Sequence, residues 1–197
     1  GAGAYLAGRR GAATAPPAFR QLTFQRGEIY AARFAPDGQT LLYAASWEGR
    51  PVEIFVSRLD SPEARPFGLK SADLLGVSPS GEMAISMGRR FAGAFQRTGT
   101  LARIGMTGGG TPREVQEDVQ WADWSPDGRS FAVVRAVGPQ MQLEYPAGKV
   151  LYRTAGSLHS PRISRDGKYV AVIDDPAGIG TSGRVIIGRV DGRAGTL

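Results

Sequence analysis

The sequence predicts an all-β fold, a β-propeller of four-stranded antiparallel blades, and three observations support this prediction. A five-residue segment occurs four times, and its final glycines are 43, 47 and 39 residues apart. An apolar run follows each copy. Pro, Gly and Thr interrupt every stretch long enough for a helix. The spacing is that of a propeller blade, so we expect about four blades, as a fragment of a larger propeller.

The repeated segment has the composition of a tight turn between two strands. Residues 124–128 read Trp-Ser-Pro-Asp-Gly, and the other copies, at 34–38, 77–81 and 163–167, read Phe-Ala-Pro-Asp-Gly, Val-Ser-Pro-Ser-Gly and Ile-Ser-Arg-Asp-Gly. The apolar residue ends a strand, Pro presets a turn angle, Asp or Ser caps the turn, and Gly accepts a positive φ. We therefore expect hairpins in series, with the turns at Ser80 and Arg165 weakened by departures from the pattern.

Each blade needs two further strands beyond this hairpin. Third strands are expected at residues 52–56, 100–104, 141–145 and 184–187, and fourth strands at 64–69, 113–115 and 149–152. The predicted blades are about 24–70, 71–116, 117–155 and 156–197, the last without an outer strand of its own. Residues 19–23 are expected to be an outer strand, either of blade four or of a blade outside this sequence.

Composition excludes several classes of function. The chain has no Cys, so disulfides and thiolate chemistry are absent. Its net charge of +6 is the excess of 24 basic residues, 21 Arg and 3 Lys, over 18 acidic residues. These basic residues are dispersed and form no run longer than two, which argues against a nucleic-acid partner.

The first 18 residues differ from the rest and are predicted to be an apolar leader and linker. Residues 1–8 are small and apolar, Arg9-Arg10 follow them, and Pro16-Pro17 lie in the linker. The order of charges does not match a signal peptide. Two interpretations stay open: a flexible leader, or the end of a transmembrane helix, which would be the only contact with a membrane.

The repeats carry a resemblance to a known family. Phe-Ala-Pro-Asp-Gly, Trp-Ser-Pro-Asp-Gly, the Leu22-Thr23 pair and the stretch Met-Thr-Gly-Gly-Gly-Thr-Pro-Arg at 106–113 resemble the WD40-like Pro-Asp repeats of TolB-type propellers. The resemblance covers residues 19 to 192. It implies a propeller that serves as a periplasmic scaffold, a peptidase accessory domain or the sensor half of a bacterial membrane serine/threonine kinase. The leader followed by a propeller most resembles the last arrangement.

No catalytic, metal or cofactor site is predicted. His159 is the only imidazole, and no Gly-x-Ser-x-Gly motif occurs. Residues 178–183 match the dinucleotide fingerprint in form, but a strand rather than a helix is expected to follow. One His and no Cys leave too few zinc ligands. The sequence thus predicts a non-enzymatic chain without a cofactor.

Two groups of residues are candidate sites. The segment 88–98 is the longest predicted connection and lies on the face opposite the Asp-Gly turns, with Arg and aromatic residues that suit a partner-binding loop: Arg89, Arg90, Phe91, Phe95 and Arg97. The alternative is that both Phe side chains fold back onto blade two. Successive side chains of a strand point to opposite sides, so the residue before each repeated apolar residue should face the central channel. Three of these residues are charged and are candidate channel-lining groups: Arg33, Asp123 and Arg162. Their neighbours should be buried between blades: Phe34, Val77, Trp124 and Ile163.

Two functions follow from these observations. The first is a non-catalytic propeller that binds a protein, peptide or small ligand, as the periplasmic, membrane-tethered sensor of a receptor kinase; a cytoplasmic location stays open. The second is the accessory propeller of a serine peptidase, or a free-standing TolB-like periplasmic scaffold. The first predicts a kinase domain before Gly1 and the second a Gly-x-Ser-x-Gly element after Leu197.

Overall fold

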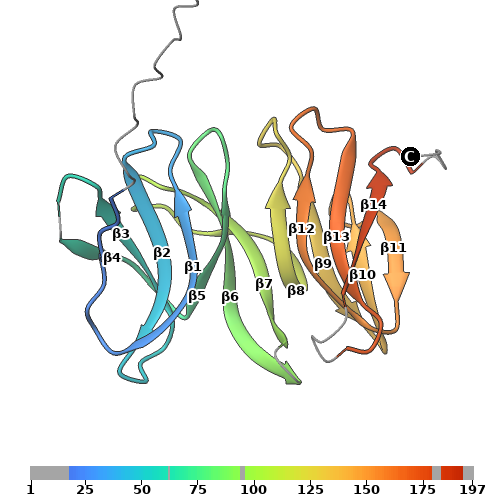
Figure 1. The fold of residues 1–197 in the computed structure, drawn as a ribbon, viewed down its shortest axis with the longest axis horizontal. Helices are drawn as coiled ribbons and strands as arrows, with labels where there is room; N and C mark the ends of the chain where they lie inside the picture. The colour runs from blue at the N-terminus through green and yellow to red at the C-terminus, as the bar shows by residue number, and fades with distance from the viewer. Residues whose placement is uncertain (1–17, 62, 94–95, 179–182, 193–197) are drawn as a thin grey trace, which may run out of the picture.

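The protein is built from β-strands. The computed structural model describes residues 18–61, 63–93, 96–178 and 183–192, which form fourteen strands and no helix. The strands pair antiparallel into sheets that stand side by side (Figure 1). Among the described residues, no helix could cross a membrane. The predicted all-β propeller fold is confirmed.

Blades one and four are separate sheets. Blade one is β1 (Gly27–Phe34), β2 (Thr40–Trp47), β3 (Glu53–Arg58) and β4 (Ala64–Lys70), in that order. Blade four is β12 (Ser157–Ile163), β13 (Tyr169–Asp175) and β14 (Arg184–Arg189). In the described part of the chain this sheet has three strands, as the sequence predicted.

Blades two and three share one seven-stranded sheet. Its members are β5 (Ala72–Val77), β6 (Glu82–Gly93), β7 (Gln96–Gly105), β8 (Arg113–Trp124), β9 (Phe131–Val137), β10 (Gln140–Glu144) and β11 (Val150–Thr154). The sequence separated an outer strand near 113–115 from the next inner strand, whereas β8 joins them. Its first half pairs with β7 and its second half with β9. Asp118, with φ of 59°, lies at the changeover.

The four repeated turns, at residues 34–38, 77–81, 124–128 and 163–167, have the same hydrogen bonds. They are called the Asp-Gly turns below, although the second has Ser80 in place of Asp. In the first, the Ala35 amide donates to the Thr40 carbonyl at 2.8 Å and the Gly38 amide donates to the Ala35 carbonyl at 3.0 Å. The other turns repeat this pair, the second with one residue fewer. All four glycines have positive φ, between 65° and 81°. The turn with Arg165 in place of Pro keeps both bonds, so Pro is not needed to form it.

Apolar clusters fill the space between consecutive blades. Leu42 and Ile54 of blade one meet Leu74 and Met83 of blade two, and similar clusters join blades two to three and three to four. Each of these three clusters includes one of the repeated apolar residues. Trp124, which is 6% exposed, belongs to the second, and the partly buried Val77 and Ile163 pack against the first and the third.

The prediction that Phe34 is buried is wrong. Its side chain is 58% exposed, because it lies on the flank of blade one that faces away from blade two, and no described blade covers that flank. The opposite flank, on blade four, has Val185 and Ile187 exposed and a hollow of about 390 Å³ beside Tyr169.

Residues 19–23 are not paired in the described part of the chain and do not complete blade four; that they are the outer strand of a blade outside this sequence stays a prediction. The described segment before β1 runs along blade one without strand pairing (Figure 1). It is held at both ends, by a bond of 2.6 Å from the Arg20 guanidinium to the Leu59 carbonyl and by one of 3.1 Å from the Glu48 amide to the Arg26 carbonyl. Phe19 and Phe24 are 94% and 81% exposed.

A candidate binding site in the central groove

The central groove is formed by the inner strand of each blade. β1 packs against β5, β5 against β8 and β8 against β12. All four inner strands shift register against their own second strand near the middle, at Ile29/Ala31, Leu74/Gly76, Val119/Trp121 and His159/Arg162. Such bulges bend a strand and re-aim its side chains. They interrupt the alternation between the two halves of each inner strand, whereas Arg33, Asp123 and Arg162 all lie after the shift, where the register is continuous.

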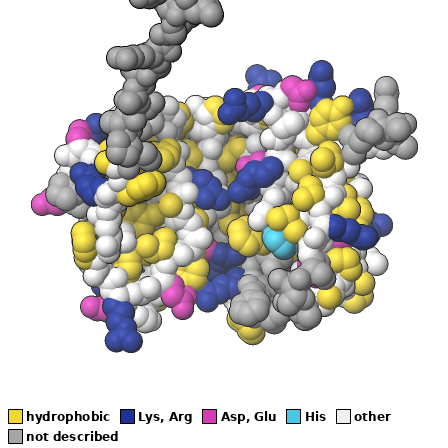
Figure 2. All heavy atoms as spheres, viewed as in Figure 1, with side chains coloured by type: hydrophobic (Ala, Val, Ile, Leu, Met, Phe, Trp, Pro, Cys, Tyr) yellow, Lys and Arg dark blue, Asp and Glu magenta, His cyan; other side chains and the backbone are white. Residues whose placement is uncertain are grey.

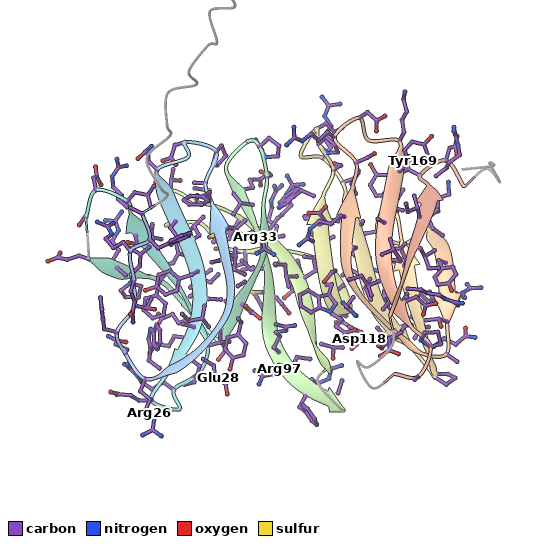
Figure 3. The ribbon with its side chains drawn as sticks, viewed as in Figure 1. Arg26, Glu28, Arg33, Arg97, Asp118 and Tyr169 are labelled. Atoms are coloured by element: carbon purple, nitrogen blue, oxygen red, sulfur yellow. The ribbon has the colours of Figure 1, made fainter. Side chains whose placement is uncertain are left out.

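A pocket of about 300 Å³ opens between the inner strands of blades one to three. Its lining is aromatic, aliphatic and charged, and consists of Tyr30, Ala31, Arg33, Asp73, Leu74, Leu75, Arg89, Phe91, Arg97 and Trp121. Lys and Arg side chains gather along the middle of this face (Figure 2), and Arg33 and Arg97 lie along that line (Figure 3). The pocket therefore combines a positive charge with an apolar wall.

A buried ion pair lies at the side of the pocket. The Arg89 guanidinium binds the Asp73 carboxylate, and the two side chains are only 12% and 3% exposed. Arg89 also donates to the carbonyls of Arg97 and Gln120, at 3.3 and 3.4 Å. Asp73 Oδ1 and Arg89 Nε are buried without a protein partner. Burial lowers the pKa of Arg89, and nearby Arg97 lowers it further.

The predicted binding loop is a hairpin. Residues 88–93 and 96–98 extend β6 and β7 beyond the blade, with Phe91 paired to Arg97 and Arg90 paired to Thr98. The side chain of Arg97 stacks over the Tyr30 ring at 4.8 Å, and Phe91 is 69% exposed. The pairing of β6 with β7 resumes at Arg90 and Phe91, with register shifts at Met87/Arg90 and Phe91/Gly93.

Only part of the predicted loop set comes together in the pocket. Arg89, Phe91 and Arg97 line it. Arg90 does not; it pairs with Asp118 of β8 instead. Phe95 lies outside the described residues.

The three predicted channel residues lie close enough to interact. Arg33 and Arg162 both interact electrostatically with Asp123 and with each other, although none of these contacts is an ion pair among the described residues. The Asp123 carboxylate accepts a bond of 2.9 Å from the Ile163 amide of the next blade. Arg33 donates at 3.5 Å to the Leu75 carbonyl, again on the next blade. Burial lowers the pKa of Arg33 and raises that of Asp123.

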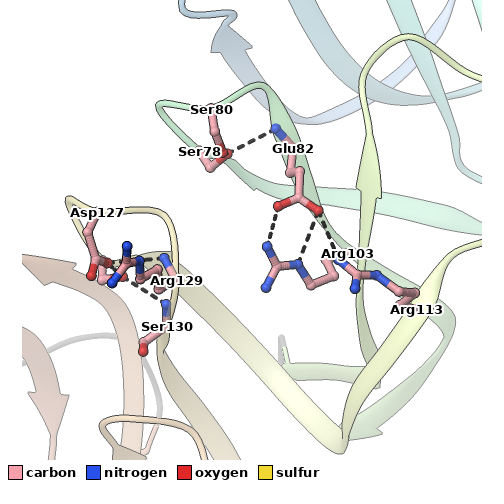
Figure 4. A network of polar contacts seen from close by, with 9 residues as sticks. Ser78, Ser80, Glu82, Arg103, Arg113, Asp127, Arg129 and Ser130 are labelled. Atoms are coloured by element: carbon pink, nitrogen blue, oxygen red, sulfur yellow. Dashed lines mark hydrogen bonds and ion pairs between the residues drawn. The ribbon is translucent and has the colours of Figure 1, made fainter.

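Other charged groups in the molecule stabilise the scaffold. Glu82 binds Arg103 and Arg113 (Figure 4). Arg103 also lies over the Trp124 ring, at 5.0 Å from its centroid. The buried Asp174 carboxylate accepts bonds from Tyr152 and Arg184, at 2.9 and 3.0 Å. These groups join strands within a blade or across a blade junction, and they do not line the pocket.

The described residues offer no catalytic constellation. The His159 Nδ1 atom lies 3.3 Å from the Ser160 hydroxyl, and no group of three His, Cys, Asp or Glu could hold a metal within the described ranges. After the glycine-rich stretch, part of which lies outside the described residues, β14 begins at Arg184 and is a strand. The dinucleotide interpretation lacks the helix it requires.

Sequence reasoning missed Tyr30, Asp73 and Trp121. Each lies beside a register shift or in a strand where alternation alone does not decide the direction of the side chain. One signal was available. Asp73 is a lone acidic residue in an apolar strand, and such a residue usually needs a buried cationic partner.

Comparison with known proteins identifies the fold. No family model and no curated protein sequence matches the chain. Among solved structures, TolB from Acinetobacter baumannii is 21% identical with a TM-score of 0.65, over 86% of this chain and 43% of that one. A putative TolB from Agrobacterium tumefaciens is 22% identical with a TM-score of 0.70, over 89% and 63%.

A third similar structure belongs to a protease. The tricorn protease is 20% identical with a TM-score of 0.62, over 89% of this chain and 19% of that one. The chain thus spans less than two thirds of each of these proteins. At these identities the likeness concerns the fold, and it shows that the chain folds as a TolB-type β-propeller.

Proposed function

We propose that this chain is a non-catalytic interaction module that binds a protein or peptide in its central groove. The observation that carries the proposal is Phe91. Its side chain is 69% exposed on the β6–β7 hairpin and lines the charged pocket. An exposed aromatic ring beside Arg residues is typical of a binding hot spot, whereas a ring that only stabilised blade two would be covered.

The pocket supports binding better than chemistry. Its charged groups are guanidiniums and one carboxylate that is already paired with Arg89. A general base or nucleophile must be free to exchange a proton, and none of these groups suits that role. A small ligand fits the same cavity, since about 300 Å³ is the lower end of small-molecule sites.

The proposed setting is extracytoplasmic, with the propeller tethered to a membrane through a segment before it, as the sensor of a receptor serine/threonine kinase. The apolar residues 1–8 followed by Arg9-Arg10 and the family resemblance support it. A peptidase accessory propeller is the second candidate, supported by the fold likeness to the tricorn protease. The sequence of the intact gene separates them: a kinase domain upstream, a Gly-x-Ser-x-Gly element downstream, or neither for a free-standing scaffold.

Peptide display tests the binding function. The 197-residue chain is used to select binders from a library of random peptides, and each binder is measured against the wild type and Phe91→Ser. We expect the dissociation constant to rise at least about tenfold in Phe91→Ser, with an unchanged melting temperature. Val115→Ser, an exposed apolar position on the outer half of β8, is the control and should change neither. A library without binders, or binders indifferent to Phe91, would overturn the proposal.

A further inference from the structure

We infer that the pocket recognises a carboxylate of an acidic peptide, held between Arg33 and Arg97 with an apolar part of the peptide against Phe91 and Trp121. The inference rests on the proposed function, because it names the chemistry of the ligand at that site. The carboxylate can come from an Asp or Glu side chain or from a C-terminus.

The first argument is the charge of the pocket. Three guanidiniums line it, on Arg33, Arg89 and Arg97, against the single carboxylate of Asp73. Asp73 is occupied by Arg89. Within the described residues, neither Arg33 nor Arg97 has a carboxylate partner at ion-pair distance, and Asp123 offsets the charge of Arg33 only from beyond that distance. An anionic ligand would supply the missing charge.

The second argument is that these guanidiniums are already held in place. Arg97 stacks on the Tyr30 ring at 4.8 Å, and Arg33 donates to the carbonyls of Ala32 and Leu75 at 2.8 and 3.5 Å. Burial also lowers the pKa of Arg33, which means that its charge is incompletely solvated. A positioned, partly desolvated guanidinium loses little entropy on binding a carboxylate and can bind it through two parallel bonds.

The third argument concerns the size and wall of the cavity. Phe91, Trp121 and Leu75 give it an apolar side next to the guanidiniums. A volume of about 300 Å³ accommodates one or two amino-acid side chains. A nucleic acid would need a longer track of phosphate contacts than two free guanidiniums provide. A peptide that carries a carboxylate next to an apolar side chain matches both halves of the site.

The experiment uses two peptide libraries and one competitor. One library is displayed so that only internal carboxylates are present, and the other leaves the C-terminal carboxylate free. We expect peptides rich in Asp and Glu to be selected from the first library, peptides bound through their free C-terminus to be selected from the second, or both. Changing the acidic residue to Asn or Gln, or amidating the C-terminus, should raise the dissociation constant about 10- to 100-fold. A mixed-sequence single-stranded oligonucleotide should not displace the peptides.

Matched variants place the carboxylate in the pocket. Arg97→Gln and Arg33→Gln should each weaken acidic peptides about 10- to 100-fold and leave the neutral versions unchanged. Arg65→Gln, the same change on the outer strand β4, should have no effect. Binding of neutral peptides with equal affinity, displacement by the oligonucleotide, or equal loss in Arg65→Gln would overturn the inference while the proposed function stands. Libraries without any binder would instead overturn the proposed function itself.

Discussion

The Asp-Gly turns and the groove between the inner strands belong to the same four repeats, but they differ in how their polar residues are used. The turns repeat one set of hydrogen bonds, whereas the groove has a different set of polar residues in each repeat. The turns make the same backbone bonds four times, even where Ser80 or Arg165 replaces the usual residue. In the groove, the equivalent position of the four repeats holds three residue types, at Arg33, Gly76, Asp123 and Arg162. The backbone position is equivalent in the four repeats, whereas the residue type varies. Such a position can therefore carry side chains that bind a ligand.

The two regions also differ in how completely polar groups are satisfied. In the turns, the exposed Asp127 and Asp166 carboxylates accept bonds from a Ser hydroxyl and a backbone amide of the same turn. Beside the groove, Asp73 and Gln120 each keep a buried oxygen without a protein partner. Such atoms destabilise a fold unless water or a ligand completes them, so the groove, unlike the turns, keeps polar groups that stability alone does not favour.

The largest expected effect tests the scaffold. Trp124→Ala should lower the free energy of unfolding by about 3–5 kcal/mol, because the ring is 6% exposed and packs on Phe131 at 4.1 Å. Phe34→Ala changes the same repeat position on the exposed flank and should cost less than about 1 kcal/mol. Chemical denaturation of both variants measures the difference. Equal losses would mean that the flank of blade one is covered in solution.

The fold could be predicted from the sequence because the repeat is local. Strand, turn and strand follow one another directly along the chain, and the spacing of the four copies sets the blades. The exceptions are tertiary. Residues 19–23 have an extended pattern but no partner strand among the described residues, and β8 joins two predicted strands because Asp118 lets the chain turn without leaving the sheet.

The second effect tests the buried pair of the groove. Asp73→Asn leaves the Arg89 charge almost fully buried and without its carboxylate, which should lower the free energy of unfolding by about 3 kcal/mol. Asp60→Asn breaks the exposed pair with Arg58 and should leave the denaturation midpoint unchanged. A mild Asp73→Asn phenotype would show that water already compensates the Arg89 charge.

The site was less predictable than the fold. Alternation identified Arg33 and Asp123, but the bulges shift the side-chain pattern of every inner strand, and no local signal shows where they fall. The pocket also depends on the length of the β6–β7 hairpin, which carries Phe91 and Arg97 over β1. Contacts between residues so far apart in the sequence follow from packing and not from a motif.

The third effect is that the pKa values of two carboxyl groups are shifted in opposite directions, so their contributions to stability depend on pH with opposite sign. Bonds from the Thr40 hydroxyl and from the Thr40 and Gln39 amides lower the pKa of Asp37 from 3.8 to about 2, whereas burial raises the pKa of Asp123. Ionised Asp37 therefore contributes stability above pH 4 that is lost as the pH falls toward 2. Asp123 has the opposite dependence, since its contribution is lost as the pH rises through its raised pKa.

NMR titration of the carboxyl carbons measures the two values directly. In denaturation experiments, Asp37→Asn should be less stable than the wild type at pH 7 and equal to it near pH 2. Asp123→Asn keeps an oxygen that can accept the Ile163 amide bond, and it should gain relative to the wild type between pH 3 and pH 7. The same sign for both carboxylates would remove the electrostatic distinction between the turns and the groove.

The smallest effect tests the repeat itself. Ser80→Asp restores the usual residue in the second turn, where the Ser78 and Ser80 hydroxyls are now 3.0 Å apart. The Ser78 hydroxyl would then donate to a carboxylate, as the Ser125 and Ser164 hydroxyls do at 2.5 and 2.6 Å. We expect a gain of about 0.5 kcal/mol in the free energy of unfolding, because a charge-assisted bond replaces a neutral one at an exposed turn. Ser80→Ala is the control, and its free energy of unfolding should fall by about 0.5 kcal/mol because the neutral bond is lost. Since Ser80 lies next to Gly128 of the following turn, a destabilised Ser80→Asp would point to repulsion from Asp127, and the turns would then have to be treated as a coupled row instead of four independent copies.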